Sequence, residues 1–214
     1  MEPMKPIGVV FDLDGVIVST DELHFQAWKQ LADREGIAFD RTINHRLRGV
    51  SRMASLAILL ERASRKYDDA ERTTMAEYKN ALYVASLAAI TPKDILPGVL
   101  AVLDELKRRK IRTAIGSSSK NARLILARLE LADAFDAVID GNDITRSKPD
   151  PEVFLRAALQ IGIPPACCYV VEDAVSGINA AVAAGMIPVA IGDAVRSPDA
   201  RFRLVDIREL TTLF

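Results

Sequence analysis

Two aspartates separated by a single residue follow a short apolar run near the start of the sequence. In the stretch IGVVFDLDG, residues 7–15, Asp12 and Asp14 come directly after a run typical of a buried strand, and Gly15 turns the chain. Two carboxylates this close repel each other and raise each other's pKa unless a positive group lies between them. Their spacing therefore predicts a site that contains a cation.

Three more polar positions follow predicted strands further along the chain. Ser117 comes after TAIG, Lys148 lies in the loop after AVID, and Glu172 and Asp173 come after CYVV. Ligands of open parallel sheets bind outside the carboxyl ends of the strands. Each position alone has an ordinary explanation, because Ser117 and the acidic pair could cap helices and Lys148 could be a solvated loop lysine. Their joint occurrence at strand ends favours a shared site.

The chemistry that suits this set is phosphoryl transfer. Asp12, Glu172 and Asp173 could hold one Mg²⁺, which prefers a few carboxylates, waters and a substrate phosphate. A carboxylate can then attack phosphorus and form an aspartyl phosphate. Asp14, two residues along an extended chain, would serve as general acid or base. Lys148 and the serine hydroxyl would neutralise and orient the transferring oxygens.

The order of the predicted elements indicates an α/β fold with a parallel sheet flanked by helices. Short β-branched runs alternate with amphipathic segments, as in sheets whose parallel strands are connected by helices on both faces. Strands are predicted at 7–11, 111–116, 136–140, 168–172 and 187–192, with a weaker one at 203–207. Helices are predicted between the later strands at 98–110, 120–131, 151–162 and 174–185.

Residues 21–91 interrupt this alternation. They predict three or four helices, within 21–36, 51–67 and 68–87. We therefore expect a small α-helical cap domain, residues 19–91, inserted into an α/β core domain made of residues 1–18 and 92–214. The two connections between cap and core would lie near 19–20 and 91–97, where we expect a hinge.

Composition argues against several classes of function. The 214 residues carry a formal net charge of −1 and the pI is near 6.2, so nothing suggests binding to nucleic acid or to an anionic membrane. The N-terminal stretch MEPMKPIGVVF predicts no signal peptide, and the apolar stretch 178–192 is broken by Gly185 and Pro188. The adjacent Cys167 and Cys168 form no disulfide framework or metal-ligand pattern. We expect a cytoplasmic protein and, in the absence of an interface signal, a monomer.

The motifs at the strand ends resemble those of a known superfamily. DLDG, the serine after the second predicted strand, the loop lysine and the acidic pair are similar to the four signature motifs of the haloacid dehalogenase superfamily, which has a Rossmann-like core. The resemblance extends from Ile7 to about Gly192. The stretches FDLDGVIVSTDELHFQAW, LRGVSRMASL, YKNALYV, LPGV, SSSKN, SKPDPEVFL and EDAVSGINAA resemble, within that superfamily, the β-phosphoglucomutase family.

This resemblance implies a role for each matching residue. Asp12 would be the nucleophile and Asp14 the general acid or base. The metal site for one Mg²⁺ would consist of Asp12, Asp14, Glu172 and Asp173. The transferring phosphate would be held by Ser117, Ser118 and Lys148, and a second phosphate by Arg52, Ser119, Lys120 and Asn121. The sugar would be surrounded by Trp28, Leu47, Gly49, Val50, Ser51 and Ser55.

Three cap residues would connect cap closure with the chemistry. The resemblance implies that His24 and Lys79 couple closure to Asp14 and that Thr20 lies in the hinge. Taken alone, His24 could be a packing residue and Lys79 a solvated helix lysine, just as Trp28 and Leu47 could be core residues of the cap. Arg52 is a phosphate candidate on physical grounds as well, because a guanidinium makes bidentate phosphate contacts and this one lies at a predicted helix start.

The implied activity is interconversion of β-D-glucose 1-phosphate and D-glucose 6-phosphate through β-D-glucose 1,6-bisphosphate, with a small sugar phosphate as partner. A sugar-phosphate phosphatase of the same superfamily and a non-catalytic phosphate-binding module are the alternatives, and the intact set of carboxylates and lysine argues against the second. The sequence departs from the family pattern at Ser19, where an acidic residue is usual, at Ser118, where alanine is common, and in its short C-terminus.

Overall fold

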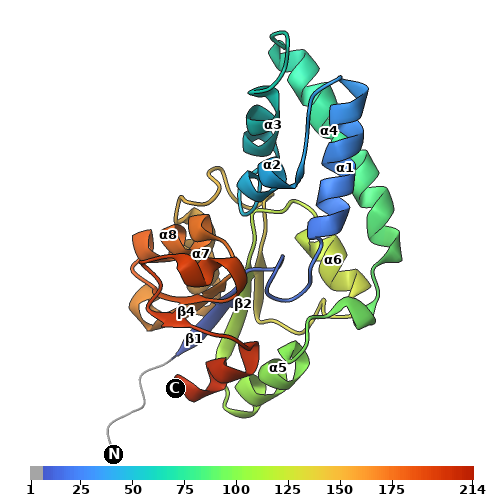
Figure 1. Ribbon diagram of the computed structural model, residues 1–214. Helices are drawn as coiled ribbons and strands as arrows, with labels where there is room; N and C mark the ends of the chain where they lie inside the picture. The colour runs from blue at the N-terminus through green and yellow to red at the C-terminus, as the bar shows by residue number, and fades with distance from the viewer. Residues whose placement is uncertain (1–6) are drawn as a thin grey trace, which may run out of the picture.

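The fold is built on one parallel sheet, seen in the computed structural model in Figure 1. The structure describes residues 7–214. Residues 1–6, which belong to the predicted core domain and to the N-terminal stretch discussed above, lie outside the described residues. Within 7–214, the strands pair in the order β3-β2-β1-β4-β5-β6, and every pair is parallel. The strands are β1 (Gly8–Phe11), β2 (Arg112–Gly116), β3 (Ala137–Ile139), β4 (Cys168–Glu172), β5 (Ile187–Ala190) and β6 (Phe202–Arg203).

The strand order changes direction between β1 and β4, and this determines where a ligand can bind. From β1 the chain adds β2 and β3 on one side, whereas β4, β5 and β6 follow on the other. Such a switch point leaves a crevice outside the carboxyl ends of the two central strands. Phe11 and Val171 are register partners there, so the residues that follow β1 and end β4 are neighbours.

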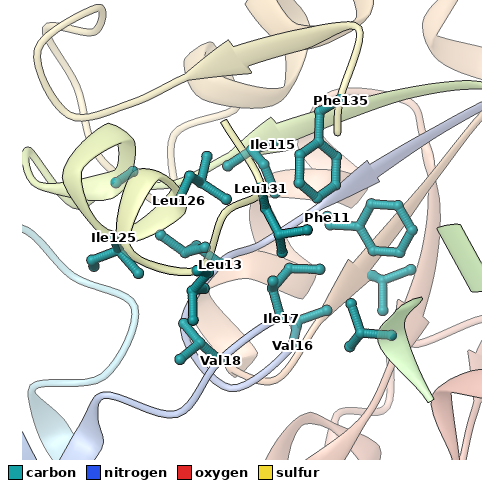
Figure 2. Packing of buried hydrophobic residues seen from close by; sticks show 14 of the residues in the cluster. Phe11, Leu13, Val16, Ile17, Val18, Ile115, Ile125, Leu126, Leu131 and Phe135 are labelled. Atoms are coloured by element: carbon teal, nitrogen blue, oxygen red, sulfur yellow. The ribbon is translucent and has the colours of Figure 1, made fainter. Parts of the chain in front are cut away.

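Alternating side chains of β1 divide the core into two layers. Val9 and Phe11 belong to a cluster that also contains side chains of α5 and α6, whereas Val10 packs with those of α7 and α8. Figure 2 shows the first cluster, in which the Phe11 and Phe135 rings meet edge to face at 6.1 Å. The covering helices are α5 (Val99–Arg108), α6 (Ala122–Arg128), α7 (Glu152–Ile161) and α8 (Val175–Ala183).

Four helices, α1–α4, form a separate layer that we call the helical segment (residues 21–86). Figure 1 shows it at the top of the view, beyond the strand ends. Its helices are α1 (Asp21–Arg34), α2 (Arg41–Arg46), α3 (Arg52–Leu60) and α4 (Asp69–Ser86), and they enclose an apolar cluster of their own that includes Trp28, Leu31, Leu56, Leu59 and Met75. The assignment of residues 19–91 as a distinct domain stays a prediction.

The chain leaves and re-enters the sheet layer at adjacent points. Val18 and Ile95 form an antiparallel bridge, and the Leu96 amide donates a hydrogen bond to the Ile17 carbonyl at 2.9 Å. The two connections of the helical segment therefore lie side by side, so a movement of the segment would bend both at one place.

Some predicted boundaries were wrong. The helix expected over 51–67 ends at Leu60, because the next helix has its own start signal, a capping box between Asp68 and Glu71. The strand expected at 203–207 is reduced to Phe202–Arg203, and Ile207–Thr212 forms the 3₁₀ helix η5. At the start of α7 the N-cap residue is Pro151, and the Asp150 carboxylate accepts a hydrogen bond from the Glu152 amide at 2.9 Å. Among the helices of residues 7–214, none combines the length and apolarity that crossing a bilayer requires.

Two leucines of α5 provide a matched test of the core. Leu106 is fully buried in the cluster beneath the sheet, whereas Leu100 on the same helix is 51% exposed. Leu106→Ala should lower the free energy of unfolding by about 2–5 kcal/mol, because it removes buried apolar surface and leaves a cavity. Leu100→Ala should change it by less than about 1 kcal/mol. Urea unfolding measures both; equal losses would contradict this packing.

Candidate active site

The loop after β1 holds both aspartates at the crevice. The Asp12 amide donates to the Val171 carbonyl at 3.0 Å, which extends the pairing of β1 with β4 by one residue. Leu13 is completely buried in the core, so the aspartates on either side of it are directed away from the apolar layer. Gly15 then turns the chain with a φ of +83°, a backbone conformation that glycine adopts without strain.

Lys148 connects the ends of two strands. Its Nζ donates to Asp12 Oδ1 at 2.6 Å and to Glu172 Oε1, and only 3% of the residue is exposed. Burial opposes the charge of the ammonium group, but the carboxylates of Asp12 and Glu172 outweigh it and raise the pKa of Lys148 above its ordinary value. Lys148 is therefore a fixed cation beneath the carboxylates.

The remaining carboxylates form a donor set for a divalent cation. One oxygen each from Asp12, Glu172 and Asp173 lies within 4.8 Å of the others. Burial, followed by repulsion from the neighbouring carboxylates, raises the pKa of Asp173 to about 8. The pKa of Glu172 rises to about 7, mainly through burial. Hard oxygen ligands that repel one another in this way fit Mg²⁺, which neutralises them.

Two glycines make room for these acidic side chains. A Cβ on Gly15 would lie 2.1 Å from Asp173 Oδ2, and a Cβ on Gly177 in α8 would lie 1.9 Å from the Glu172 carboxylate. Real side chains do not approach so closely. Glycine at these positions is therefore part of the geometry of the carboxylate cluster.

Asp14 is connected to the helical segment by hydrogen bonds. Burial, and then the charge of Asp12, raises the pKa of Asp14 to about 7. The Thr20 hydroxyl donates to Asp14 Oδ1, and the Tyr83 hydroxyl donates to Thr20 Oγ1 at 3.0 Å. A carboxyl with this pKa can take up and release a proton near neutral pH, which suits a general acid or base.

His24 and Lys79 lie next to the hydrogen bonds that connect Tyr83, Thr20 and Asp14. Lys79 Nζ is 2.7 Å from His24 Nδ1, and the His24 ring stacks on that of Tyr83 at 3.9 Å between centroids. Burial and the cation Lys79 lower the pKa of His24 well below its ordinary value, so a neutral imidazole accepts from the lysine. Burial, and then repulsion from Arg52, lowers the pKa of Lys79 to about 7.

The loop after β2 supplies hydroxyl and amide groups opposite Asp12. Ser117 is 2% exposed, and its Oγ accepts the Ser119 amide at 3.1 Å. The loop after β3 supports it from behind, because the Gly141 amide donates to the Ser119 carbonyl and Asn142 Nδ2 to the Lys120 carbonyl. A Cβ on Gly141 would lie 2.4 Å from the Ser118 carbonyl oxygen, so the two loops touch.

The helical segment and the sheet enclose a cavity of about 380 Å³ between them. Arg52 lines its wall half-buried, and burial lowers the pKa of its guanidinium, an effect that no carboxylate of the described residues offsets. The other predicted residues that line the cavity are Asp12, Asp14, Thr20, His24, Trp28, Leu47, Gly49, Val50, Ser51, Ser55, Lys79, Ser117, Ser118, Ser119, Lys120, Asn121, Lys148 and Asp173. Glu172 lies behind Lys148 instead, with 1% exposed.

Two predicted sugar contacts have structural partners as well. The Ser51 hydroxyl accepts the Ala54 amide at 3.2 Å and caps α3, and the Ser55 hydroxyl lies 3.5 Å from the Leu47 carbonyl. Asn121 Nδ2 donates to Asn80 Oδ1 of α4 at 3.0 Å, a contact between the phosphate loop and the helical segment.

Comparisons with known proteins identify the family of this chain. Residues 8–185 match the model of the haloacid dehalogenase-like hydrolase family. The chain belongs to that family. It is 44% identical to a β-phosphoglucomutase of Bacillus subtilis, over 86% of this chain and 83% of the relative. It is 35% identical to a fructose-1-phosphate phosphatase of Escherichia coli, over 84% and 93%.

A solved structure of the same family has the same fold. The crystal structure of a β-phosphoglucomutase from Clostridium difficile superimposes with a TM-score of 0.90 at 37% identity, covering 96% of this chain and 93% of the other. Enzymes of the haloacid dehalogenase-like family use Mg²⁺, and the carboxylate cluster provides the ligands that such an ion needs.

Sequence reasoning missed several residues of the cavity. Tyr83, Asn80 and Arg48 all line it, although none was singled out. For Tyr83 a signal exists, because it follows Lys79 by four residues on one helix face and lies within the YKNALYV stretch. Asn80 belongs to the same stretch and Arg48 to LRGVSRMASL, but their partners Asn121 and Asp193 are distant in the sequence and are identified only by the structure.

The space at Gly177 yields a test of the metal site. Gly177→Ala should displace the Glu172 carboxylate and lower Mg²⁺ affinity by about 10- to 100-fold, the loss typical of a disturbed metal environment. Alanine itself favours helix, so the fold should persist. Isothermal titration calorimetry with Mg²⁺ measures the change, with the exposed Asn179→Ala on the same helix as control. Equal affinities in the two variants would contradict the assignment.

Proposed function

We propose that this protein is a Mg²⁺-dependent β-phosphoglucomutase that interconverts β-D-glucose 1-phosphate and D-glucose 6-phosphate. The reaction passes through an aspartyl phosphate on Asp12 and through β-D-glucose 1,6-bisphosphate, which also activates the enzyme by phosphorylating it. Its ligands are small sugar phosphates. Since every group in the scheme comes from one chain, the proposal includes action as a monomer, in the cytoplasm where hexose phosphates are metabolised.

The observation that carries the proposal is the presence of two groups of cationic and hydrogen-bonding side chains in one cavity. Lys148 contacts Asp12 and lines the cavity with Ser117, and the same cavity is lined by Arg52, Lys120 and Asn121. Lys148 is already paired with two carboxylates, whereas no carboxylate within residues 7–214 offsets the buried charge of Arg52. An unpaired, half-buried guanidinium suits a phosphate group. A substrate with phosphates at both ends fits such a cavity better than a monophosphate does.

In the first transfer, phosphoryl-Asp12 passes its phosphoryl group to the sugar. The free 6-hydroxyl of glucose 1-phosphate attacks phosphorus, a new P–O bond forms, and the bond between phosphorus and the Asp12 oxygen breaks. Asp14, with its pKa near 7, accepts the hydroxyl proton. Lys148 and the Ser117 hydroxyl balance the charge of the transferring oxygens. The product is the 1,6-bisphosphate and a free Asp12 carboxylate.

The second transfer runs in the opposite sense after the bisphosphate has turned around. With the 1-phosphate beside Asp12 and the 6-phosphate on Arg52, the Asp12 carboxylate attacks phosphorus and the bond to the sugar 1-oxygen breaks. Asp14 returns its proton to that oxygen. Glucose 6-phosphate leaves, and Asp12 is again phosphorylated. Mg²⁺, when bound by Asp12, Asp173 and the Asp14 carbonyl with Glu172 behind them, neutralises the carboxylates and the incoming phosphate.

The helical segment would act as a cap that keeps water from phosphoryl-Asp12 between the two transfers. His24 and Lys79 would couple closure of the cap to Asp14 through Tyr83 and Thr20, and Thr20 is the proposed hinge residue. Trp28, Leu47, Gly49, Val50, Ser51 and Ser55 would surround the sugar. Exclusion of water is what separates transfer to a sugar from hydrolysis in such a site.

A sugar-phosphate phosphatase is the second candidate, because the chain also resembles a phosphatase of fructose 1-phosphate over most of its length. ³¹P NMR of the protein with Mg²⁺, β-D-glucose 1-phosphate and a trace of the 1,6-bisphosphate separates the two. We expect glucose 6-phosphate with little inorganic phosphate. Inorganic phosphate as the main product would overturn the mutase proposal in favour of the phosphatase.

Removing the nucleophile tests the covalent route. Asp12→Asn should lower turnover by at least about a thousandfold, because an amide cannot attack phosphorus, and the effect of a lost nucleophile is of that order. Coupled spectrophotometric assay of glucose 6-phosphate gives the rate, and the exposed Asp133→Asn serves as control. Activity within tenfold of the native protein would exclude Asp12 as the nucleophile.

Removing the charge of Arg52 tests the contact with the second phosphate, which a mutase needs and a phosphatase does not. Arg52→Gln should raise the apparent dissociation constant for the 1,6-bisphosphate about 10- to 100-fold, since hydrogen bonds to charged groups are strong ones. Arg46→Gln, which changes an exposed arginine paired with Glu61, should leave it unchanged. Activation curves with increasing bisphosphate measure both; a shift of the same size in each variant would argue against a specific phosphate contact.

A further inference from the structure

Arg48 lines the cavity, but the scheme above gives it no role, and its side chain joins two parts of the fold. It lies in the loop between α2 and α3, and its Nη2 donates to Asp21 Oδ2 at 2.6 Å. Its Nε also lies 3.3 Å from Asp21 Oδ1. The remaining nitrogen, Nη1, donates to Oδ2 of Asp193. One guanidinium therefore connects two carboxylates.

These two carboxylates belong to different layers. Asp21 begins α1 in the helical segment, whereas Asp193 lies in the 3₁₀ helix η4 (Gly192–Arg196), directly after β5. A second side chain of the helical segment approaches the same place, because His45 Nε2 is 3.5 Å from Asp193 Oδ2. The Asp193 carboxylate of the sheet layer thus interacts with two side chains of the helical segment, Arg48 and His45.

The backbone beside Arg48 packs closely against the sheet layer as well. A Cβ on Gly49 would lie 2.4 Å from Ser176 Oγ and 3.0 Å from the Ala174 Cβ, both at the start of α8. The hydrogen bond between Asn80 and Asn121 joins the layers elsewhere along the cavity, at 3.0 Å. These three contacts hold the helical segment against the sheet layer, an arrangement that we call closed, and the Arg48–Asp193 pair is the ionic one among them.

We propose that the Arg48–Asp193 ion pair latches the helical segment over the cavity and thereby determines how the phosphoryl group is partitioned between a sugar hydroxyl and water. The second half of this inference rests on the function proposed above. Arg48 acts here as a positioning residue, and Asp193 is not among the described residues that line the cavity.

Asp21 makes the latch asymmetric. Two contacts to Asp21 hold the Arg48 guanidinium within the helical segment, so opening breaks only the contact with Asp193. The guanidinium stays oriented for reclosure, which reduces the entropy lost when the pair reforms. Arg48 and Asp193 side chains remain 32% and 39% exposed, so screening limits the strength of the pair. We therefore expect an effect of about two- to fivefold on the closed population.

The single tryptophan of the chain reports closure without any assay of activity. Trp28 lines the cavity and is 3% exposed in the closed arrangement. Asp193→Asn should increase the acrylamide quenching constant of Trp28 about two- to fivefold, and Asp193→Glu should restore it. Glu61→Gln, which breaks a comparable ion pair inside the helical segment with Arg46, is the matched control and should have no effect.

Added salt provides a second, independent readout. Raising sodium chloride from about 0.01 M to 1 M shortens the Debye length from about 30 Å to 3 Å and should weaken the latch. Quenching of Trp28 should therefore rise with salt in the native protein and stay constant in Asp193→Asn. Identical quenching in native protein, Asp193→Asn and Glu61→Gln at every salt concentration would overturn the latch.

The partition of products tests the second half of the proposal. In the ³¹P NMR experiment, Asp193→Asn should increase the ratio of inorganic phosphate to glucose 6-phosphate about two- to fivefold over the native protein. More quenching with an unchanged ratio would overturn the role of the latch in partition. A native protein that releases mainly phosphate would overturn the mutase proposal instead, while the fluorescence result still decides the latch.

Discussion

Mutual repulsion among four carboxylates at the carboxyl ends of β1 and β4 is the constraint on which the rest of the site depends. Asp12 and Glu172 can lie so close only because Lys148 donates to both from below. Even so, the pKa values of the buried Asp14 and Asp173 rise to about 7 and 8. A divalent cation would complete the neutralisation and would offset the charge of an incoming phosphate as well.

The sheet determines where this cluster lies, and the helical segment covers it. The change of strand direction between β1 and β4 places the carboxylates at a crevice, and the helical segment encloses that crevice with Arg52 on its wall. Hydrogen bonds from Tyr83 through Thr20 to Asp14 connect the segment with the proposed general acid. In the proposed function, these hydrogen bonds couple closure of the helical segment to the general acid or base.

Much of this could be predicted because the signals are local. Strand-end residues such as Asp12, Ser117 and Lys148 follow recognisable apolar runs, and parallel pairing brings such ends to one edge. The fold class was confirmed for the same reason. The prediction of a strand at 203–207 had the wrong bounds. The observed strand β6 has two residues and pairs on one side only, which leaves little pattern in the sequence.

What the sequence could not reveal depends on contacts between distant residues. Arg48 is separated from Asp193 by 145 positions, and nothing around either residue predicts the other. Gly141 matters because the Ser118 carbonyl lies against it, a consequence of how two loops pack. The roles of the cap residues remain predictions drawn from a resemblance, since their positions on the cavity wall are compatible with packing as well as with binding.

The central claim is that Asp12 carries the phosphoryl group. The most direct measurement is rapid acid quenching of the native protein after mixing with Mg²⁺ and β-D-glucose 1,6-bisphosphate, followed by proteolysis and mass spectrometry. The account predicts one phosphoryl group, on the peptide containing Asp12 and assigned to that residue by fragmentation. A phosphoryl group on another side chain, or none at any time while glucose 6-phosphate accumulates, would contradict it.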